Sequence, residues 1–329
     1  MSKMTAYIHS TGFYVPETIM SNSDWSQWVE TSDDWIYSHT GIRNRRIAAP
    51  EEATSDLAVK AALDCLSRGG VSPEDVDMIL VATTTPDFLS FPSTASLVQH
   101  KLGAFKAGAM DLSAACTGFV YALETARAMI LAQSAQRILV IGAEVFSRIM
   151  NWRDRNTCIL FGDGAAAVLV TPSPNSKSQI VNSFLRSDGS GGPSLERHAG
   201  GTKYPMTPQT PPEESLTFMD GRKVYNFALT VVKQSILEIL EKNGKTLDDV
   251  TWIVPHQANA RIIEASAKRL DIPMGKFFMN MEDYANTSGA TIPLALAEMD
   301  RKNLLKRGDL VLTVGFGAGL TYGANLIIW

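Results

Sequence analysis

Ser72-Pro73-Glu74-Asp75-Val76-Asp77-Met78-Ile79 is the segment from which the architecture of this chain can be inferred, because its pattern returns 174 residues later. The second copy reads Thr246-Leu247-Asp248-Asp249-Val250-Thr251-Trp252-Ile253. The likeness continues downstream, where residues 137–141 match residues 309–313 at an offset of 172. We infer that the chain contains two copies of one α/β unit.

Aligning the two copies at the offset of 172 places Cys116 opposite Ser288, each within a turn of small residues. One half carries the cysteine, and the other carries His256 and Asn286. Ligands of α/β proteins usually bind where strands end at a junction of this kind. We therefore expect an active site between two halves, which we place at residues 1–174 and 175–329.

Short apolar runs with strand character alternate with longer segments whose apolar residues recur every three or four positions. Strands are expected at 78–82, 108–112, 137–141, 166–170, 252–255, 310–314 and 324–329. Helices are expected at 57–68, 118–133, 224–242 and 260–270. The helix at 118–133 is apolar on nearly every side, which predicts a position between two sheets.

The composition excludes several classes of protein. The chain has 329 residues, of which 45% are hydrophobic and 19% are charged, as is typical of a globular protein. A net charge of −4 gives no reason to expect binding to nucleic acid. No apolar run is long enough to span a membrane, and no signal peptide is evident. The three cysteines form no paired framework, which favours the cytoplasm.

Two segments interrupt the duplicated pattern. Residues 25–50 are polar and carry three tryptophans, and substrate binding is often built on such additional segments. Residues 188–214 are rich in Gly, Pro and Thr, which predicts a surface excursion or a hairpin with little core of its own. The boundary between the halves is expected near residues 171–177.

Cys116 has the sequence context of a nucleophile. It follows an expected strand and begins an expected helix, where unpaired N–H groups and the helix dipole stabilise a thiolate. Small neighbours would let a substrate approach the sulfur. The alternative is a buried structural cysteine, which is the better interpretation of Cys65 and Cys158.

His256 and Asn286 also lie in polar turns, and His256 follows an expected strand. Each also has an ordinary structural interpretation: His256 as a core histidine whose hydrogen bonds are all made within the protein, and Asn286 as an asparagine that stabilises a turn. Residues 315–319, Gly-Phe-Gly-Ala-Gly, look like half of a dinucleotide loop, but no βαβ unit follows them. We interpret them as a tight turn whose N–H groups face a reacting carbonyl oxygen.

These residues resemble a known family, the 3-oxoacyl-[acyl-carrier-protein] synthases III, which have the thiolase fold. The resemblance extends from Gly12 to Trp329. It rests on the motifs TSDDWI (31–36), TGIR (40–43), ACTGF (115–119), DR (154–155), FGDGA (161–165), PHQAN (255–259), NTS (286–288) and GFGAG (315–319). The resemblance implies a five-layer αβαβα sandwich, and it implies an acyltransferase that starts type II fatty acid synthesis.

The resemblance also implies catalytic roles. Cys116 would take an acyl group from an acyl-CoA, and the backbone N–H groups of Cys116 and Ala318 would form the oxyanion hole. His256 and Asn286 would stabilise the enolate formed when malonyl on the carrier protein loses carbon dioxide. Fixed donors in a dry pocket stabilise such charge better than water does. No metal and no permanently bound cofactor is expected.

Further contacts are implied for the substrates. Thr31, Trp35 and Arg155 would bind CoA, although His39 stands where some relatives have an arginine. Phe146, Phe161 and Met219 would line the acyl pocket, and Phe91 would close the pocket of the other subunit in a homodimer. The acidic acyl carrier protein requires a local basic face. The residues assigned to that face are Gln257, Ala258, Asn259, Ala260, Arg261, Lys268 and Arg269.

Other activities remain open at this point. A papain-like cysteine protease also uses Cys, His and Asn in this order, but its Cys-Gly-x-Cys signature is missing. A thiolase would carry a second cysteine near its C-terminus, and a hydroxymethylglutaryl-CoA synthase would need a glutamate base, of which the first half gives no sign. A secondary-metabolite condensing enzyme, an acyltransferase that does not condense, and the choice of primer stay undecided.

Overall fold

The computed structural model describes residues 4–173 and 177–329, and it contains two main sheets that share one pattern. The first sheet has the strand order β1-β7-β6-β4-β5, and the second has the order β8-β13-β12-β11. In the first sheet β7 and β6 are antiparallel, and β4 lies parallel to β6. In the second sheet β13 and β12 are antiparallel in the same way, and β11 lies parallel to β12. The predicted division between residues 174 and 175 falls on residues outside the described part of the chain.

The strands are β1 (Ala6–Tyr14), β2 (Thr18–Ser21), β3 (Asn44–Ile47), β4 (Met78–Ala82), β5 (Gly108–Leu112), β6 (Ile138–Val145), β7 (Asp163–Pro172), β8 (Gln179–Ser187), β9 (Leu195–Arg197), β10 (Thr217–Met219), β11 (Trp252–Pro255), β12 (Leu310–Gly317) and β13 (Thr321–Ile328). The helices are α1 (Asn22–Trp25), α2 (Asp33–Thr40), α3 (Thr54–Gly69), α4 (Thr94–Leu102), α5 (Gly118–Leu131), α6 (Arg155–Cys158), α7 (Gly221–Lys242), α8 (Ala260–Leu270), α9 (Met281–Tyr284) and α10 (Thr291–Arg301). Every strand and helix expected from the sequence is present, with ends that differ by a few residues. The sequence pattern gave no sign of β1 and β8, the strands at the far edge of each sheet.

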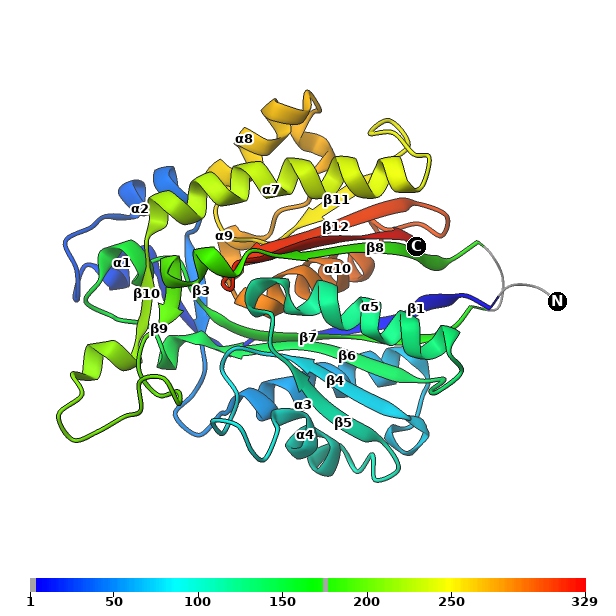
Figure 1. Cartoon of the computed structure of the whole chain (residues 1–329), viewed down its shortest axis with the longest axis horizontal. Helices are drawn as coiled ribbons and strands as arrows, with labels where there is room; N and C mark the ends of the chain where they lie inside the picture. Colours follow the sequence, from blue (N-terminus) through cyan, green and yellow to red (C-terminus); the bar gives the residue numbers. More distant parts are fainter. Residues whose placement is uncertain (1–3, 174–176) are drawn as a thin grey trace.

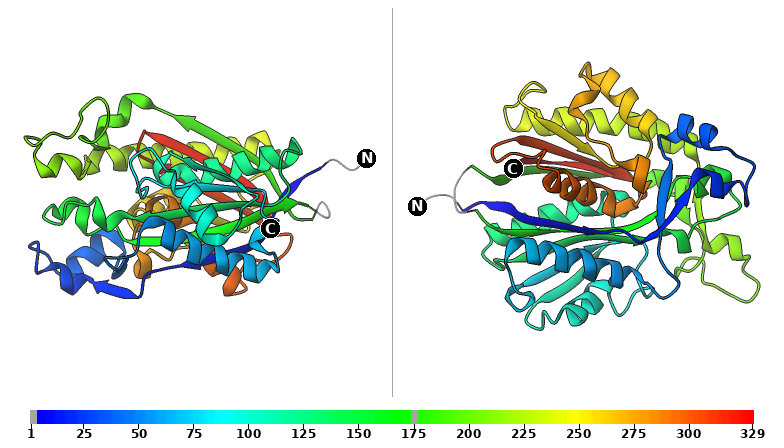
Figure 2. Two further views of the ribbon diagram at one scale, coloured as in Figure 1. Left: turned by 90° about the horizontal axis from the view of Figure 1, so that it is seen from below. Right: turned by 180° about the vertical axis from the view of Figure 1, so that it is seen from behind.

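The elements form five layers, so the predicted αβαβα sandwich is confirmed (Figure 1). Helices α5 and α10 lie between the sheets, where Phe119, Leu123 and Leu296 pack in one buried core with residues of both sheets. Helices α3 and α4 cover the outer face of the first sheet, and α7 and α8 cover that of the second. Seen from behind, these outer pairs again lie on opposite sides of the molecule (Figure 2). Alternation along β6 explains the layering, because Val140 faces the central core and Ile141 the outer one.

The two halves share one pattern of elements, except that β5 has no counterpart among the strands of the second sheet. The alignment predicted from sequence is off by one residue at the turns that contain Cys116 and Ser288. A short 3₁₀ turn begins at Ala115 in one half and at Ser288 in the other, and α5 and α10 follow each turn directly. Both Ala115 and Ser288 have left-handed backbones, with φ of 47° and 49°. The counterpart of Cys116 is therefore Gly289 and not Ser288. The offset is 174 between the first residues of β4 and β11, 173 between those of the two 3₁₀ turns and 172 between those of β6 and β12.

Two sequence interpretations need correction. Residues 315–317 continue strand β12, so the predicted tight turn is confined to Ala318 and Gly319. The hairpin expected to begin in residues 188–214 is present, since β9 pairs with β10 in antiparallel fashion. The segment is nevertheless not confined to the surface, because Leu195 reaches the cavity at Cys116. In the part of the chain that the structure describes, no helix combines the length and apolar character needed to cross a bilayer.

Candidate active site

Cys116 lies in the 3₁₀ turn Ala115–Thr117, directly before helix α5. The left-handed backbone of Ala115 bends the chain sharply between β5 and α5 and presents Cys116 at the bend. Strand β12 passes against this turn. A Cβ atom on Gly317 would lie 2.7 Å from the Cβ of Cys116, so only glycine fits there. The bend and the close strand together fix the position of the sulfur.

His256 is held rigidly at the end of β11. Its backbone N–H donates to the carbonyl of Val314 at 2.8 Å, and its ring meets Phe316 edge to face at 5.2 Å. The ring Nδ1 lies 2.7 Å from the hydroxyl of Thr291. The same hydroxyl lies 3.0 Å from the Ser288 carbonyl, to which it can also donate. Its single proton serves one of these two partners, and the ring proton is on Nε2 when that partner is Nδ1. The second half thus positions a histidine with one ring nitrogen already engaged.

Asn286 is oriented by its own turn. Its backbone N–H donates to the Leu160 carbonyl at 2.9 Å, and its side-chain Oδ1 accepts the N–H of Ser288 at 2.8 Å. Because Oδ1 is occupied, the amide N–H₂ group is the end that faces the cavity. The side chain is only 5% exposed. It therefore offers a hydrogen-bond donor that carries no charge at any pH.

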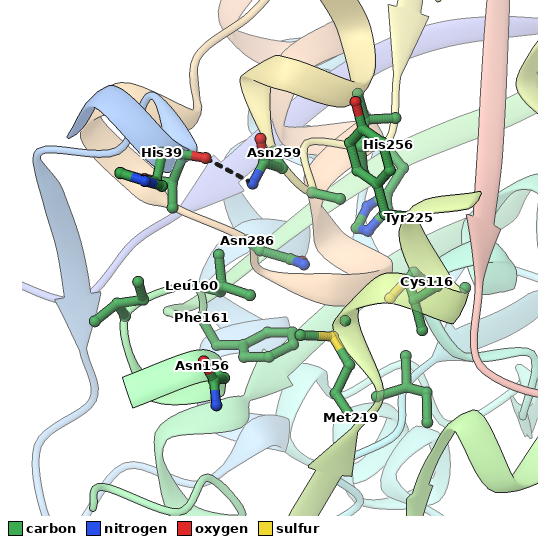
Figure 3. A pocket seen from close by; sticks show the side chains of 18 of the residues that line it. His39, Cys116, Asn156, Leu160, Phe161, Met219, Tyr225, His256, Asn259 and Asn286 are labelled. Atoms are coloured by element: carbon green, nitrogen blue, oxygen red, sulfur yellow. Dashed lines mark hydrogen bonds between the residues drawn. The ribbon is translucent and has the colours of Figure 1, made fainter. Parts of the chain in front are cut away.

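Cys116, His256 and Asn286 line a single cavity of about 390 Å³, as the sequence predicted (Figure 3). A second cavity of about 190 Å³ also reaches Cys116, and it is lined by Phe146, Phe161 and Ala318. Cys116 therefore stands where two cavities meet. One of them extends outward past Trp35 and His39, and the other leads inward to apolar side chains.

Burial controls the ionisation of both reactive groups. Loss of solvation lowers the pKa of His256 to about 3, so its imidazole is neutral near pH 7. Burial raises the pKa of the Cys116 thiol to about 12, against weaker hydrogen bonds from Ser288 and from the backbone N–H groups of Cys116 and Ala318. The N–H groups of Cys116 and Ala318 lower this pKa, in the direction expected for donors that stabilise a thiolate, but desolvation outweighs them in the free protein.

Of the predicted CoA residues, Trp35 lines the larger cavity beside His39, and Arg155 packs against Trp35. The guanidinium of Arg155 lies 4.6 Å from the ring centre of Trp35, and the ring of His39 stacks on Trp35 at 4.2 Å. Arg155 also donates to the carbonyl of Glu30 at 2.9 Å. The hydroxyl oxygen of Thr31 is buried without a hydrogen-bond partner, and Thr31 lines neither cavity. Trp35, His39 and Arg155 form one aromatic and cationic mouth.

The predicted carrier-protein residues do not all face solvent. Gln257 is 1% exposed, and its amide is engaged by Pro255, Phe278 and Asn280, so the structure removes it from the docking face. Asn259 caps α8 and also donates to the carbonyl of His39 at 3.1 Å. Ala258 and Asn259 line the mouth of the cavity, and Ala260 follows them at the start of α8. Arg261, Lys268 and Arg269 are exposed on α8.

The predicted acyl-pocket residues divide into two groups. Phe146 and Phe161 stack at 3.9 Å and line the inner cavity, while Met219 lines the outer cavity together with Phe161. Phe91 is 84% exposed and lines neither of the two cavities in the single chain. Its predicted contribution thus concerns a second subunit.

Sequence reasoning missed three residues near the site. Arg222 and Tyr225 lie at the start of α7 and line the outer cavity, and nothing in their sequence context indicates this. Glu144 is completely buried beside the 3₁₀ turn of Ser288. A signal for Glu144 existed, because an acidic residue within the apolar run of β6 is unusual in a buried strand.

Comparison with known proteins identifies the relatives of this chain. Residues 110–189 match the family model described as 3-oxoacyl-[acyl-carrier-protein] synthase III, and residues 240–329 match the model of its C-terminal part. The chain is 48% identical to beta-ketoacyl-[acyl-carrier-protein] synthase III of Caldanaerobacter subterraneus subsp. tengcongensis over 99% of this chain and 98% of that protein. It is also 48% identical to the Clostridium acetobutylicum protein of that name, over 98% of each. The crystal structure of 3-oxoacyl-[acyl-carrier-protein] synthase III from Aquifex aeolicus superposes with a TM-score of 0.91 at 42% identity, covering 98% of this chain and 100% of that one.

Proposed function

The chain belongs to the 3-oxoacyl-[acyl-carrier-protein] synthase III family, and from this premise we propose that it catalyses the initiating condensation of type II fatty acid synthesis. An acyl-CoA, with acetyl-CoA as the expected primer, acylates Cys116. The acyl group then condenses with malonyl-acyl carrier protein to give 3-oxoacyl-acyl carrier protein, CoA and carbon dioxide. The observation that carries the proposal is the convergence of Cys116, His256 and Asn286 on one cavity.

In the acylation step the sulfur of Cys116 attacks the thioester carbonyl of the acyl-CoA. The carbonyl oxygen becomes negative, and the N–H groups of Cys116 and Ala318 stabilise it. A thiolate leaves as readily as it attacks, so cysteine suits a thioester exchange that must run twice. Side chains of this kind supply the chemistry without a resident cofactor.

In the condensation step the donors of the second half stabilise an enolate. Loss of carbon dioxide from malonyl places negative charge on the thioester oxygen, where the Asn286 amide and the His256 ring donate. Both donors are neutral and rigid, as the low pKa of His256 and the fixed Oδ1 of Asn286 support. The enolate then attacks the acyl carbon on Cys116.

One experiment tests the function directly. A panel of acyl-CoAs is incubated with the protein, and the mass added to Cys116 is measured for each. Malonyl-acyl carrier protein is then added, and carbon dioxide and the 3-oxoacyl product are measured. Acylation without condensation would identify an acyltransferase instead. Preference for a bulky or aromatic primer would favour a condensing enzyme of secondary metabolism.

We expect the Trp35→Ala variant to bind acyl-CoA poorly, because the adenine loses a ring on which to stack. Stacking of a base on an aromatic ring is worth about 1–3 kcal/mol, so KM for acyl-CoA should rise roughly fivefold to 150-fold. An acyl-pantetheine thioester lacks the nucleotide and should acylate both proteins equally. Trp28→Ala is the matched control, since Trp28 is 43% exposed and lines neither cavity. Equal loss with both substrates would refute the adenine contact.

We expect the double variant Lys268→Gln with Arg269→Gln to weaken docking of the carrier protein. Both side chains are exposed on α8, whose first turn adjoins the cavity mouth, and rim charges act mainly on encounter with an acidic partner. KM for malonyl-acyl carrier protein should rise roughly threefold to tenfold at low salt, while acylation by acyl-CoA stays unchanged. Lys245→Gln with Lys306→Gln is the matched control, because these lysines precede β11 and β12 at the opposite end of the sheet from His256. Equal damage to both half-reactions would contradict the assignment.

The working unit that we propose is a homodimer in the cytoplasm. The loop after β4 exposes three large apolar side chains, Phe88 at 52%, Leu89 at 63% and Phe91 at 84%, and such a group favours burial against another subunit. Phe91 would then reach the acyl pocket of that subunit. All three cysteines are free, which suits a reducing compartment. A monomer in sedimentation experiments at working concentration would rule out the dimer.

A further inference from the structure

Glu144 is a buried carboxyl group that the mechanism above does not use. It lies on β6 and is 0% exposed. Its oxygens accept hydrogen bonds from the Thr84 N–H at 3.1 Å, from the Thr84 hydroxyl at 3.0 Å and from the Thr85 hydroxyl at 2.5 Å. The Thr85 hydroxyl itself accepts the Val145 N–H, so its own proton is directed to Glu144. Donors on all sides indicate that Glu144 is an ionised acceptor in the free protein.

Glu144 also contacts the turn that faces the nucleophile. The N–H of Gly289 points to Glu144 at 3.4 Å. The hydroxyl of Ser288, the preceding residue, is close enough to lower the pKa of the same carboxylate. The thiol of Cys116 in turn donates to the Ser288 hydroxyl at 3.5 Å. The Ser288 hydroxyl therefore stands between the sulfur and a buried carboxylate.

The thiol proton needs such an acceptor. Attack on a thioester requires the thiolate, while burial holds the pKa of Cys116 at about 12. His256 is a poor acceptor, because burial lowers the pKa of its imidazole to about 3. Burial raises the pKa of Glu144, which makes this carboxylate a better base than an exposed one. The other carboxylates on neighbouring elements are bound elsewhere, Asp163 by Ser147 and Ala48, and Asp87 by Ser55.

We propose that Glu144 is the proton store of the reaction, receiving the Cys116 proton through the Ser288 hydroxyl. In acylation the sulfur forms its bond to the acyl carbon and the bond from that carbon to CoA sulfur breaks. The thiol proton moves to Ser288, whose own proton moves to Glu144. CoA leaves as a thiolate and takes a proton from solvent. The acyl-enzyme therefore carries a neutral, protonated Glu144.

The proton returns in the second half-reaction. Malonyl loses carbon dioxide, and the enolate forms a carbon–carbon bond to the acyl carbon while the bond to the Cys116 sulfur breaks. The leaving thiolate recovers its proton from Ser288, which is reprotonated by Glu144. The cycle ends with a thiol and a carboxylate, so protons and charges balance. This inference rests on the proposed function for its second half only, because the first transfer requires just Cys116, Ser288 and Glu144.

The test measures thiol reactivity and needs no substrate. The rate of Cys116 alkylation by iodoacetamide is measured by mass spectrometry between about pH 6 and 9. Internal transfer from Cys116 to Glu144 leaves the number of bound protons unchanged, so the wild-type rate should be almost independent of pH. In Ser288→Ala and in Glu144→Gln the thiol must lose its proton to solvent. Their rates should be lower at pH 6 and rise about tenfold per pH unit.

Controls separate a proton store from a structural brace. Asp163→Asn removes a carboxyl that is 0% exposed on the adjacent strand but has no link to Cys116, and it should keep the flat profile. His256→Ala should keep it as well. Ser288→Ala is tolerated at its φ of 49°, since Ala115 occupies φ of 47°.

A flat profile in both Ser288→Ala and Glu144→Gln, or a steep one in the wild type, would overturn the proposal. A steep profile in His256→Ala would instead make His256 the acceptor. Loss of condensation with these profiles intact would count against the proposed function alone.

Discussion

Replacing Cys116 by alanine is expected to abolish transfer of an acyl group from acyl-CoA and, with it, formation of the 3-oxoacyl product. No other side chain at the junction of the two cavities is a nucleophile of comparable strength, because the Ser288 hydroxyl ionises far less readily than a thiol and is a poorer leaving group in a thioester exchange. Loss of a covalent nucleophile typically lowers turnover by on the order of 10⁴-fold or more. Mass spectrometry should detect no acyl adduct on the variant, whereas the wild type gains one acyl group per chain.

The same variant should retain slow release of carbon dioxide from malonyl-acyl carrier protein, because His256 and Asn286 are untouched. Cys158→Ala is the matched control, since Cys158 is also free and 0% exposed but lines neither cavity. That variant should be acylated at Cys116 like the wild type. An acyl adduct on the Cys116→Ala protein, at any residue, would exclude Cys116 as the sole nucleophile.

Replacing Asn286 by alanine is expected to suppress decarboxylation while sparing acylation. The enolate oxygen loses one of its two donors, and one such donor is worth about 3 kcal/mol of barrier, or roughly a hundredfold in rate. The acylation rate should stay within about threefold, because the oxyanion of that step faces the N–H groups of Cys116 and Ala318. Release of carbon dioxide and formation of the acyl adduct are measured separately on the same preparation.

Asn325→Ala provides the control for Asn286. Asn325 is 0% exposed and donates to the Val120 carbonyl at 3.1 Å, but it lies away from both cavities. Its loss should lower the melting temperature and leave the ratio of the two half-reactions unchanged. Equal loss of both half-reactions in Asn286→Ala would show that the residue supports only the turn.

The pH dependence of decarboxylation follows from the same site. The folded pKa of His256, about 3, lies below its usual value of 6.5, so the ring stays neutral at every pH above about 4. The decarboxylation rate should therefore show no histidine titration between about pH 5 and 8. The stability of the fold, by contrast, depends on pH. Below about pH 6.5 the histidine binds a proton in the unfolded chain but not in the folded chain, so the free energy of unfolding decreases as the pH falls. An inflection near pH 6.5 in the decarboxylation rate would mean that His256 is solvated during the reaction.

The sequence by itself determined the layers and the three side chains that we propose to react. Alternating strands and helices with a repeated pattern are enough to predict an α/β sandwich. The helix at residues 118–133 is apolar on nearly every side, and this is enough to place it between the sheets. The motifs around Cys116, His256 and Asn286 were also enough to bring these three residues together. Periodicity reports burial along a segment, and motifs report chemistry, so both kinds of information are local.

Only the tertiary structure decided which groups ionise and which residues meet across the halves. The helix position of Cys116 suggested a thiolate, but burial from every side reverses that expectation. Gln257 shares a motif with exposed neighbours, yet it is buried. Glu144 and Ser288 are 144 positions apart in the chain, and their contact follows from the packing of β6 against the turn before α10. Desolvation of a group and its contacts with distant segments depend on all the atoms that surround it in the folded protein. A local sequence pattern does not specify those atoms.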